Sequence, residues 1–201
     1  MNNEKETHPF EPWVPEGAWI LICGTFPPPA SRWSMKFYYP NYINDMWRVM
    51  GLIYFNDKDI FVDSEHHTFY EDKIKDFLNR EGIALSDTGG EVERLRGNAS
   101  DKYLEIKKPF ALAALLEQLP ECTDIATTGE KAAGVVAQLT GTKIPKVGEY
   151  EEVEIVMNDG ACRKLRHWRM PSTSRAYPLA LAKKAELYGK MLRSRQNEGV
   201  S

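Results

Sequence analysis

Short apolar runs alternate along this chain with segments whose apolar residues recur at helical spacing. Runs at 19–24, 83–86 and 123–128 are each bounded by glycine or by a polar turn, which is typical of buried strands. Strands that alternate with helices favour a largely parallel sheet covered by helices on both faces. The sequence therefore predicts an α/β fold.

A further pair of strands is predicted near the end of the chain. The runs at 153–157 and 162–169 are separated by Asn158-Asp-Gly160, which is a strong hairpin signal. The last core strand should therefore have an antiparallel neighbour at the edge of the sheet. Between the strands we expect a loop over 91–102 and five helices. The first begins near Asn44, the second includes 74–78 and ends at Gly82, and the third runs from Pro109 to Leu119. The fourth includes 132–139, and the fifth begins at Pro178.

The length of 201 residues suits one α/β domain, and no polar tract divides the chain. We expect an extended lead-in over 1–18, a single domain over 19–195 and a polar tail over 196–201. The lead-in lacks the basic start and apolar centre of a signal peptide, and no apolar stretch approaches the roughly 20 residues that cross a bilayer. Three scattered cysteines, none in a C-x-x-C pair, favour a reducing compartment, so a cytoplasmic location is expected.

The charges are distributed unevenly. The segment from Ala161 to the end has ten Lys and Arg against two acidic residues, a net charge of +8, whereas the whole chain carries −3 and the remainder therefore −11. Such asymmetry predicts a cationic face for an anionic ligand. The alternative is a solvated helix surface without a binding role.

Two loops rich in glycine, proline and serine follow predicted strands. Gly24-Thr-Phe-Pro-Pro-Pro-Ala-Ser31 follows the first strand, and Met170-Pro-Ser-Thr-Ser-Arg-Ala-Tyr177 follows the last. Open α/β sheets bind ligands at the carboxyl ends of their strands, where such loops expose backbone N–H groups. The two loops should therefore face each other across one pocket.

Several segments in this order resemble the uracil-DNA glycosylase superfamily, and most closely its hypoxanthine-DNA glycosylase branch. No single segment is specific, but their order and spacing are, and the resemblance extends over nearly the whole chain. The matching segments are Ile20-Leu-Ile-Cys-Gly-Thr-Phe-Pro-Pro with Ser31, Tyr38-Tyr39, Asn44-Asp-Met-Trp47, Gly82-Ile-Ala-Leu-Ser-Asp87, Thr127-Thr-Gly129 and Met170-Pro-Ser-Thr-Ser174.

The resemblance implies a three-layer α/β/α fold with a central, mainly parallel four-stranded sheet, to which the hairpin adds an antiparallel edge strand. It also implies a monofunctional enzyme that hydrolyses the N-glycosidic bond of a deaminated base, hypoxanthine or uracil, flipped out of DNA. The expected partner is DNA containing such a base. We expect a monomer with no cofactor and no membrane association. We also expect no metal site, because the adjacent side chains of His66 and His67 point in different directions and no further metal-binding residues cluster near them in the sequence.

The catalytic residue implied by the resemblance is Asn44. Other branches carry an Asp or Asn in the first loop, at the place that Phe26 holds here, and some carry a histidine where this chain has Met170. The Asn44 amide can orient a water but is no general base, so stabilisation of the departing base and the cationic sugar must supply much of the acceleration. The alternative is that Asn44 only caps the helix that follows.

The flipped base is expected to contact both loops and the end of the second strand. Phe26 stacks on the base or else plugs the core, and Asp87 reads the hydrogen-bonding edge of the base or else only forms a turn. The full set of expected substrate contacts is Gly24, Thr25, Phe26, Pro27, Tyr39, Asp87, Met170 and Ser172.

DNA outside the pocket is expected to meet hydroxyl groups and cations around the second loop. Arg175 replaces a proline common in the branch, and Tyr177 replaces an asparagine. Arg175 should fill the gap left by the flipped base, pair with a phosphate, or be exposed without a role. The expected DNA contacts are Ser31, Thr173, Ser174, Arg175, Arg169 and Lys183.

Two other functions fit the same sequence. The first is a nucleic-acid-binding module that keeps the pocket without catalysis, which the missing Asp and His favour. The second is hydrolysis of a free nucleoside or nucleotide, for which no residue that fills the duplex gap is needed.

Overall fold

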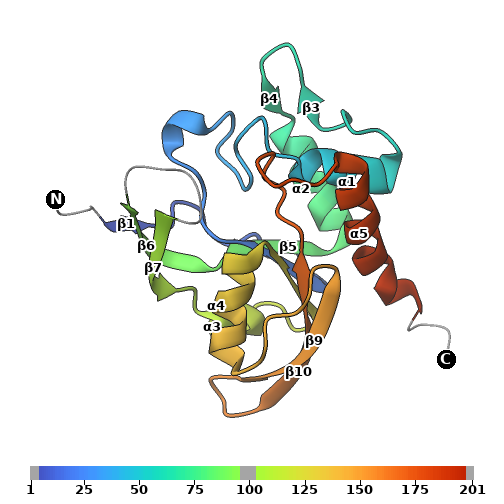
Figure 1. Cartoon of the computed structure of the whole chain (residues 1–201). Coiled ribbons are helices and arrows are strands. Elements are labelled where there is room, and N and C mark those ends of the chain that lie inside the picture. Colours follow the sequence, from blue (N-terminus) through green and yellow to red (C-terminus); the bar gives the residue numbers. More distant parts are fainter. Residues whose placement is uncertain (1–4, 96–102, 198–201) are drawn as a thin grey trace.

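The computed structural model describes residues 5–95 and 103–197, and its centre is a five-stranded sheet with the strand order β5-β2-β8-β10-β9 (Figure 1). Strands β5, β2, β8 and β10 are parallel, and β9 pairs with β10 antiparallel. The prediction of four parallel strands with an antiparallel edge strand is thus confirmed. The sheet strands are β2 (Ile20–Gly24), β5 (Ile83–Asp87), β8 (Asp124–Thr128), β9 (Glu149–Val156) and β10 (Cys162–Met170).

Helices cover both faces of this sheet. Side chains alternate along β2, so that Ile20 and Ile22 face one layer while Leu21 and Cys23 face the other. The first layer contains α1 (Met46–Phe55), α2 (Glu71–Glu81) and α5 (Leu181–Arg193), and the second contains α3 (Leu112–Glu117) and α4 (Glu130–Thr140). The short remaining elements are η1 (Ala30–Arg32), η4 (Ser194–Asn197) and the hairpin β3 (Val62–Asp63) with β4 (Thr68–Phe69).

A second sheet lies beside the first loop and has the order β1-β6-β7. It is formed by β1 (Lys5–Thr7), β6 (Gly89–Arg94) and β7 (Leu104–Pro109). The prediction of a loop over 91–102 is wrong for 91–94, because these polar residues pair through their backbones while only Val92 is buried. The rest of that prediction, 96–102, falls outside the described residues.

Two predicted helix starts are also wrong. Pro109 ends β7 instead of opening a helix, and the edge position of this strand accepts a residue without an N–H. Helix α3 begins three residues later, at Leu112. Similarly, α5 begins at Leu181, three residues after Pro178. The predicted end of α2 at Gly82 is confirmed, since this glycine has the left-handed conformation (φ +64°).

The segment before β2 is extended and attached to the edge of the main sheet. Strand β1 pairs with β6, and the backbones of Trp13 and Leu85 exchange two hydrogen bonds of 2.9 Å. None of the helices in the described part of the chain is long and apolar enough to cross a membrane.

Candidate functional site

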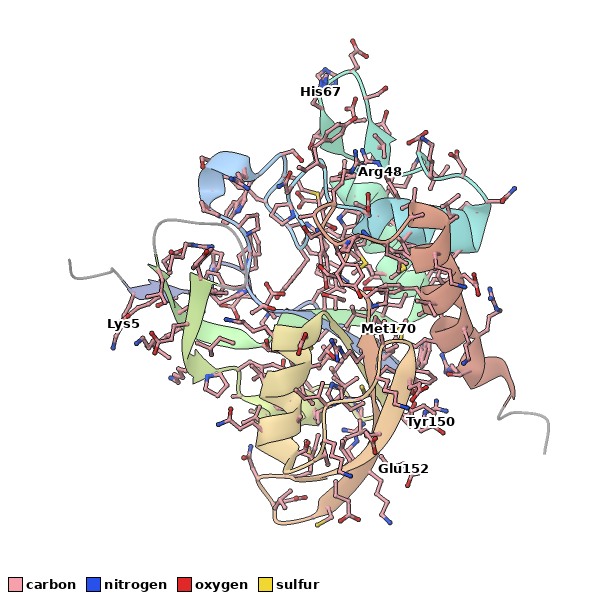
Figure 2. The ribbon with its side chains drawn as sticks, viewed as in Figure 1. Lys5, Arg48, His67, Tyr150, Glu152 and Met170 are labelled. Carbon is pink, nitrogen blue, oxygen red and sulfur yellow. The ribbon has the colours of Figure 1, made fainter. Side chains whose placement is uncertain are left out.

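A cavity of about 810 Å³ lies at the carboxyl ends of the parallel strands, between the loop after β2 and the loop after β10. As the sequence predicts, both loops line the same cavity. Figure 2 shows Met170 in the interior of the molecule at the end of β10, whereas Tyr150 and Glu152 lie on the outer strand β9. The parallel sheet thus places the ends of strands from opposite halves of the sequence at one site.

Most of the predicted site residues line this cavity. The lining residues that the sequence predicts are Gly24, Thr25, Phe26, Pro27, Tyr39, Asn44, Asp87, Arg169, Met170, Ser172, Thr173 and Ser174.

Three predicted DNA contacts do not line the cavity. Ser31 lies exposed in η1, and the Lys183 ammonium on α5 pairs with Glu186 at 2.7 Å. Arg175, whose side chain is 58% exposed, places its guanidinium 3.3 Å from a carboxylate oxygen of Asp45. Ser31 thus belongs to the first loop, whereas Arg175 lies in the second loop and Lys183 at the start of α5.

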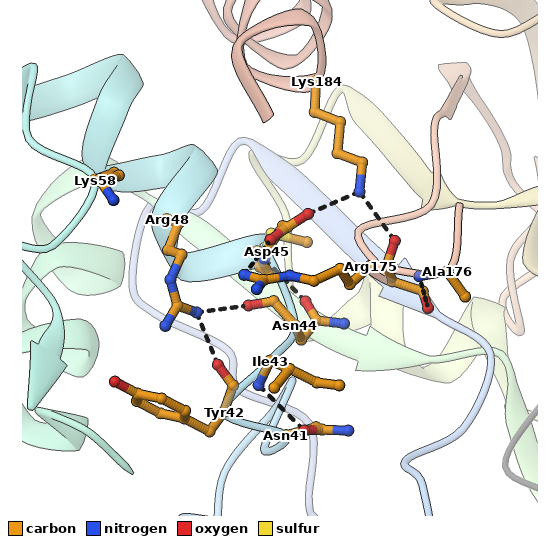
Figure 3. Close-up of polar contacts among 12 residues, drawn as sticks. Asn41, Tyr42, Ile43, Asn44, Asp45, Arg48, Lys58, Arg175, Ala176 and Lys184 are labelled. Carbon is orange, nitrogen blue, oxygen red and sulfur yellow. Dashed lines mark hydrogen bonds and ion pairs between the residues drawn. The ribbon is translucent and has the colours of Figure 1, made fainter. Parts of the chain in front are cut away.

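Asn44 is half-buried two residues before α1, and its side-chain oxygen accepts a hydrogen bond from the Met46 N–H at 2.9 Å. This hydrogen bond satisfies the first backbone N–H of α1, although the N-cap position itself is held by Asp45. Asn44 also lines the cavity, so one residue both supports the start of α1 and contributes to the site. Arg48 fixes the segment 42–44, because its guanidinium donates to the carbonyl oxygens of Tyr42 and Asn44 (Figure 3).

A buried ion pair fixes the second loop against the start of α1. The Lys184 ammonium, which has no exposed surface, lies 2.9 Å from Asp45 Oδ2 and also donates to the carbonyl oxygen of Ser174 at 2.9 Å (Figure 3). The Asp45 N–H donates to the carbonyl oxygen of Thr173 at 2.9 Å. Asn44 and the second loop therefore keep a fixed relative position across the cavity.

Asp87 ends β5 as a buried carboxylate on the cavity wall, 7% exposed. A Cβ atom at Gly24 would lie 2.5 Å from Asp87 Oδ1, so only glycine allows the carboxylate this close to β2. The other oxygen, Oδ2, lies 2.9 Å from His8 Nε2. Nearby, the hydroxyl of Tyr39 hydrogen-bonds to Thr128 at 3.3 Å, and burial together with Asp87 raises the pKa of this phenol well above its usual value.

Phe26 is partly buried and lies between the cavity and the N-terminal segment. It lines the cavity, and its ring also packs edge-on against His8 with the ring centres 5.2 Å apart. The guanidinium of Arg94 lies 5.5 Å from the centre of the same ring and donates to the carbonyl oxygen of Pro27 at 2.7 Å. The small sheet therefore supports the first loop from outside the cavity.

Several residues of the site cannot be found from local sequence patterns. Glu130 and Lys131, at the start of α4, line the cavity, as do Arg32 and Asn41 in the first loop region. The Lys131 ammonium donates to the carbonyl oxygen of Leu104. For Glu130 and Lys131, the one indication in the sequence is their place directly after Gly129, the residue that follows β8.

Metal-binding groups are sparse in the part of the chain that the structure describes. No group of three or more His, Cys, Asp or Glu side chains there could hold a metal ion. His66 instead places Nδ1 2.8 Å from Asp63 Oδ2 at a 70% exposed position.

No protein-family model matches the sequence, and no curated protein matches it. A solution NMR structure from Methanosarcina acetivorans, described as a "putative Uracil DNA glycosylase", is similar with a TM-score of 0.59 and 21% sequence identity. The match covers 94% of this chain and 99% of that chain. At this identity the likeness concerns the fold, and the chain therefore has the mixed α/β fold of that structure, with a mostly parallel central sheet.

Proposed function

We propose that the protein is a monofunctional DNA glycosylase that hydrolyses the N-glycosidic bond of hypoxanthine or uracil flipped out of DNA. The observation that carries this proposal is one cavity that Asn44, Asp87 and Phe26 line together from three chain segments. Its volume of about 810 Å³ suits a base with its sugar, and it opens where parallel sheets bind ligands. The fold shared with the archaeal structure supports the same class.

The proposed reaction passes through a cationic sugar. The bond from C1′ to the base breaks and its electron pair leaves with the base, after which a water oxygen bonds to C1′ and the water proton passes to the departed base anion. Asn44 orients this water with its amide. Asp87, an ionised carboxylate that only accepts hydrogen bonds, accepts one from the ring N–H that hypoxanthine and uracil share. Phe26 stacks on the base.

The nucleophile in this proposal is water and not a lysine. Lys131 lines the cavity, but its ammonium is engaged by the Leu104 carbonyl oxygen. Borohydride should therefore trap no covalent complex between enzyme and DNA, and Lys131→Ala should still release the base. A trapped complex would show a bifunctional enzyme instead.

DNA on either side of the flipped nucleotide is proposed to contact the second loop and its surroundings. Ser172 and Ser174 have hydroxyl groups near the cavity mouth for phosphate oxygens, and Arg169 adds a cation there. Arg175 is exposed beside them and fills the gap in the duplex or pairs with a phosphate. Ser31, Thr173 and Lys183 are further proposed contacts.

The test is release of the base from oligonucleotides with one uracil or one deoxyinosine, in single strands and duplexes. The rate of base release should fall by about 100-fold or more in Asn44→Ala. Asn44→Ser separates the two roles of this residue, because serine still caps the helix but is too short to replace the amide. If Asn44→Ser releases the base as fast as the wild type, the proposed role of Asn44 is wrong.

A binding module without catalysis is the second candidate. It is favoured by the first loop, where Phe26 stands in place of an acid, and by Met170, a fully buried thioether that donates no proton. Salt-sensitive DNA binding without any release of a base from either substrate would favour this candidate over the glycosylase.

A further inference from the structure

His8 is not among the residues that line the cavity. It lies in the segment before β2, which hydrogen-bonds to the chain around Asp87 both at His8 and at Trp13. The backbone N–H of His8 donates to the Gly90 carbonyl oxygen at 2.9 Å, directly after β1. Five residues later, Trp13 exchanges two backbone hydrogen bonds with Leu85 on β5. The imidazole is therefore held by the backbone against the end of β5, where Asp87 lies.

Both ring nitrogens of His8 face oxygen acceptors. Nε2 lies 2.9 Å from Asp87 Oδ2, and Nδ1 lies 2.8 Å from the carbonyl oxygen of Phe10. The Phe10 N–H lies 3.2 Å from Nδ1 and can donate to it, so a neutral ring with its proton on Nε2 is also fully hydrogen-bonded. The buried carboxylate beside Nε2 is what favours the charged form of the ring. Burial lowers the pKa of His8, but the hydrogen bond and charge of Asp87 outweigh it and raise the pKa above its ordinary value of 6.5.

The His8 side chain is 12% exposed and the Asp87 side chain 7% exposed, so water screens the interaction between their charges only weakly. With His8 protonated, the pair is neutral overall. With His8 deprotonated, Asp87 is an uncompensated negative charge on the cavity wall. A bond cleavage that puts negative charge on a departing base is opposed by such a lone carboxylate.

Other groups around the pair keep their charge near neutral pH. Burial raises the pKa values of Cys23, Tyr38 and Tyr39, so these groups stay neutral there. Glu11, on the segment of His8 itself, is the other carboxylate that acts on the imidazole, and Arg94 lies across the Phe26 ring. Among these groups of the described chain, His8 is the one that changes charge between weakly acidic and weakly alkaline pH.

We propose that His8 is a positioning residue whose imidazolium fixes Asp87 and compensates its charge, so that the cavity accepts a base whose bond to the sugar is breaking. His8 touches Asp87 and not the substrate. This inference rests on the proposed glycosylase function. It assigns a functional role to the N-terminal segment, which supplies the partner of a cavity carboxylate.

The first test is the pH profile of base release between about pH 5.5 and about pH 9 under single-turnover conditions, with the full-length chain. Release by the wild type should decline by up to about tenfold per pH unit above the pKa of His8. His8→Gln should be at least about tenfold slower at about pH 6 and should lack this alkaline decline. A variant that keeps the wild-type profile would overturn the proposal.

A matched control is available in His66, which also pairs with an aspartate but is 70% exposed and lies outside the cavity lining. His66→Gln should keep both the rate and the pH profile of the wild type. If His66→Gln changes the profile as His8→Gln does, the alkaline decline does not belong to His8 and the proposal fails.

A second measurement separates this proposal from the proposed function. An NMR titration of the His8 ring should give a pKa above 6.5 in the wild type and a lower one in Asp87→Asn. No base release by the wild type would overturn the glycosylase function and with it the role of His8 in the reaction. A His8 pKa that is unchanged by Asp87→Asn would overturn the ion pair itself, whether or not the protein is a glycosylase.

Discussion

The Lys184 ammonium lies 2.9 Å from Asp45 Oδ2, and 139 residues separate the two in the sequence. Lys184 has no exposed surface and the Asp45 side chain is 8% exposed. The pair joins α5 to the start of α1, and both partners also hydrogen-bond to the backbone of the second loop. The position of that loop relative to Asn44 therefore depends on one buried pair of charges.

Replacement of Lys184 by methionine should destabilise the protein by about 3–5 kcal/mol, because it leaves the buried Asp45 carboxylate with only the largely exposed Arg175 as a cation. Urea unfolding measures this free energy. The control is Lys183→Met, which breaks an exposed pair with Glu186 and should cost at most about 1 kcal/mol. Equal losses in the two variants would show that burial does not distinguish these neighbouring lysines.

Gly24→Ala should displace the Asp87 carboxylate, since the new methyl group would lie 2.5 Å from Oδ1. Such crowding costs about 1–3 kcal/mol, and we expect loss of base release at the same time. Gly134→Ala is the control. Gly134 lies inside α4, and a methyl group there would be in ordinary contact with the Ile144 side chain, at 3.7 Å. This second change should stabilise the helix by about 0.5–1 kcal/mol. A Gly24→Ala variant with normal stability and activity would contradict the packing described here.

The sheet and the cavity loops were predictable because they depend on local signals. Apolar runs bounded by glycine mark β2, β5 and β8, and the Asn158-Asp-Gly160 turn marks the β9–β10 hairpin. The carboxyl ends of parallel strands must then lie at one edge, which brings the loops together. The same reasoning could not find β6, whose charged residues pair through the backbone with β7 and with β1, and β1 lies more than 80 residues earlier in the chain.

The partners of the cavity residues were not predictable for the same reason. Charge alone selects Lys183 as readily as Lys184, and only the tertiary structure reveals which of them is buried against Asp45. His8 is 79 residues from Asp87 and lies in a segment without apolar periodicity. Local patterns predicted which segments form the site, whereas burial and long-range contacts decide how their side chains are held.

His167 should make the protein sensitive to acid. The imidazole is fully buried on β10, with Nε2 3.0 Å from the Thr127 hydroxyl, and burial lowers its pKa from 6.5 to about 4. Between these values the unfolded chain binds a proton that the folded chain does not, so stability falls as pH decreases from 6.5 to about 4. The loss attributable to this group is about 3 kcal/mol.

Urea midpoints at about pH 7 and about pH 4.5 measure this loss, which should be smaller in His167→Gln than in the wild type. The exposed His66 provides the control, and His66→Gln should retain the full acid sensitivity. An equal loss in the wild type and His167→Gln would assign the acid sensitivity to other groups.

Arg169 should contribute to DNA affinity through charge. It lines the cavity at the end of β10, with its guanidinium 3.2 Å from the exposed Glu130 carboxylate. If it contacts one phosphate, Arg169→Ala should weaken binding for all sequences and reduce the slope of log K against log salt by about 1. Lys164→Ala is a control on the same strand, because Lys164 lies near the opposite end of β10 and is 81% exposed. Its salt slope should equal that of the wild type, and a loss of slope in Lys164→Ala but not in Arg169→Ala would place the DNA at the other edge of the sheet.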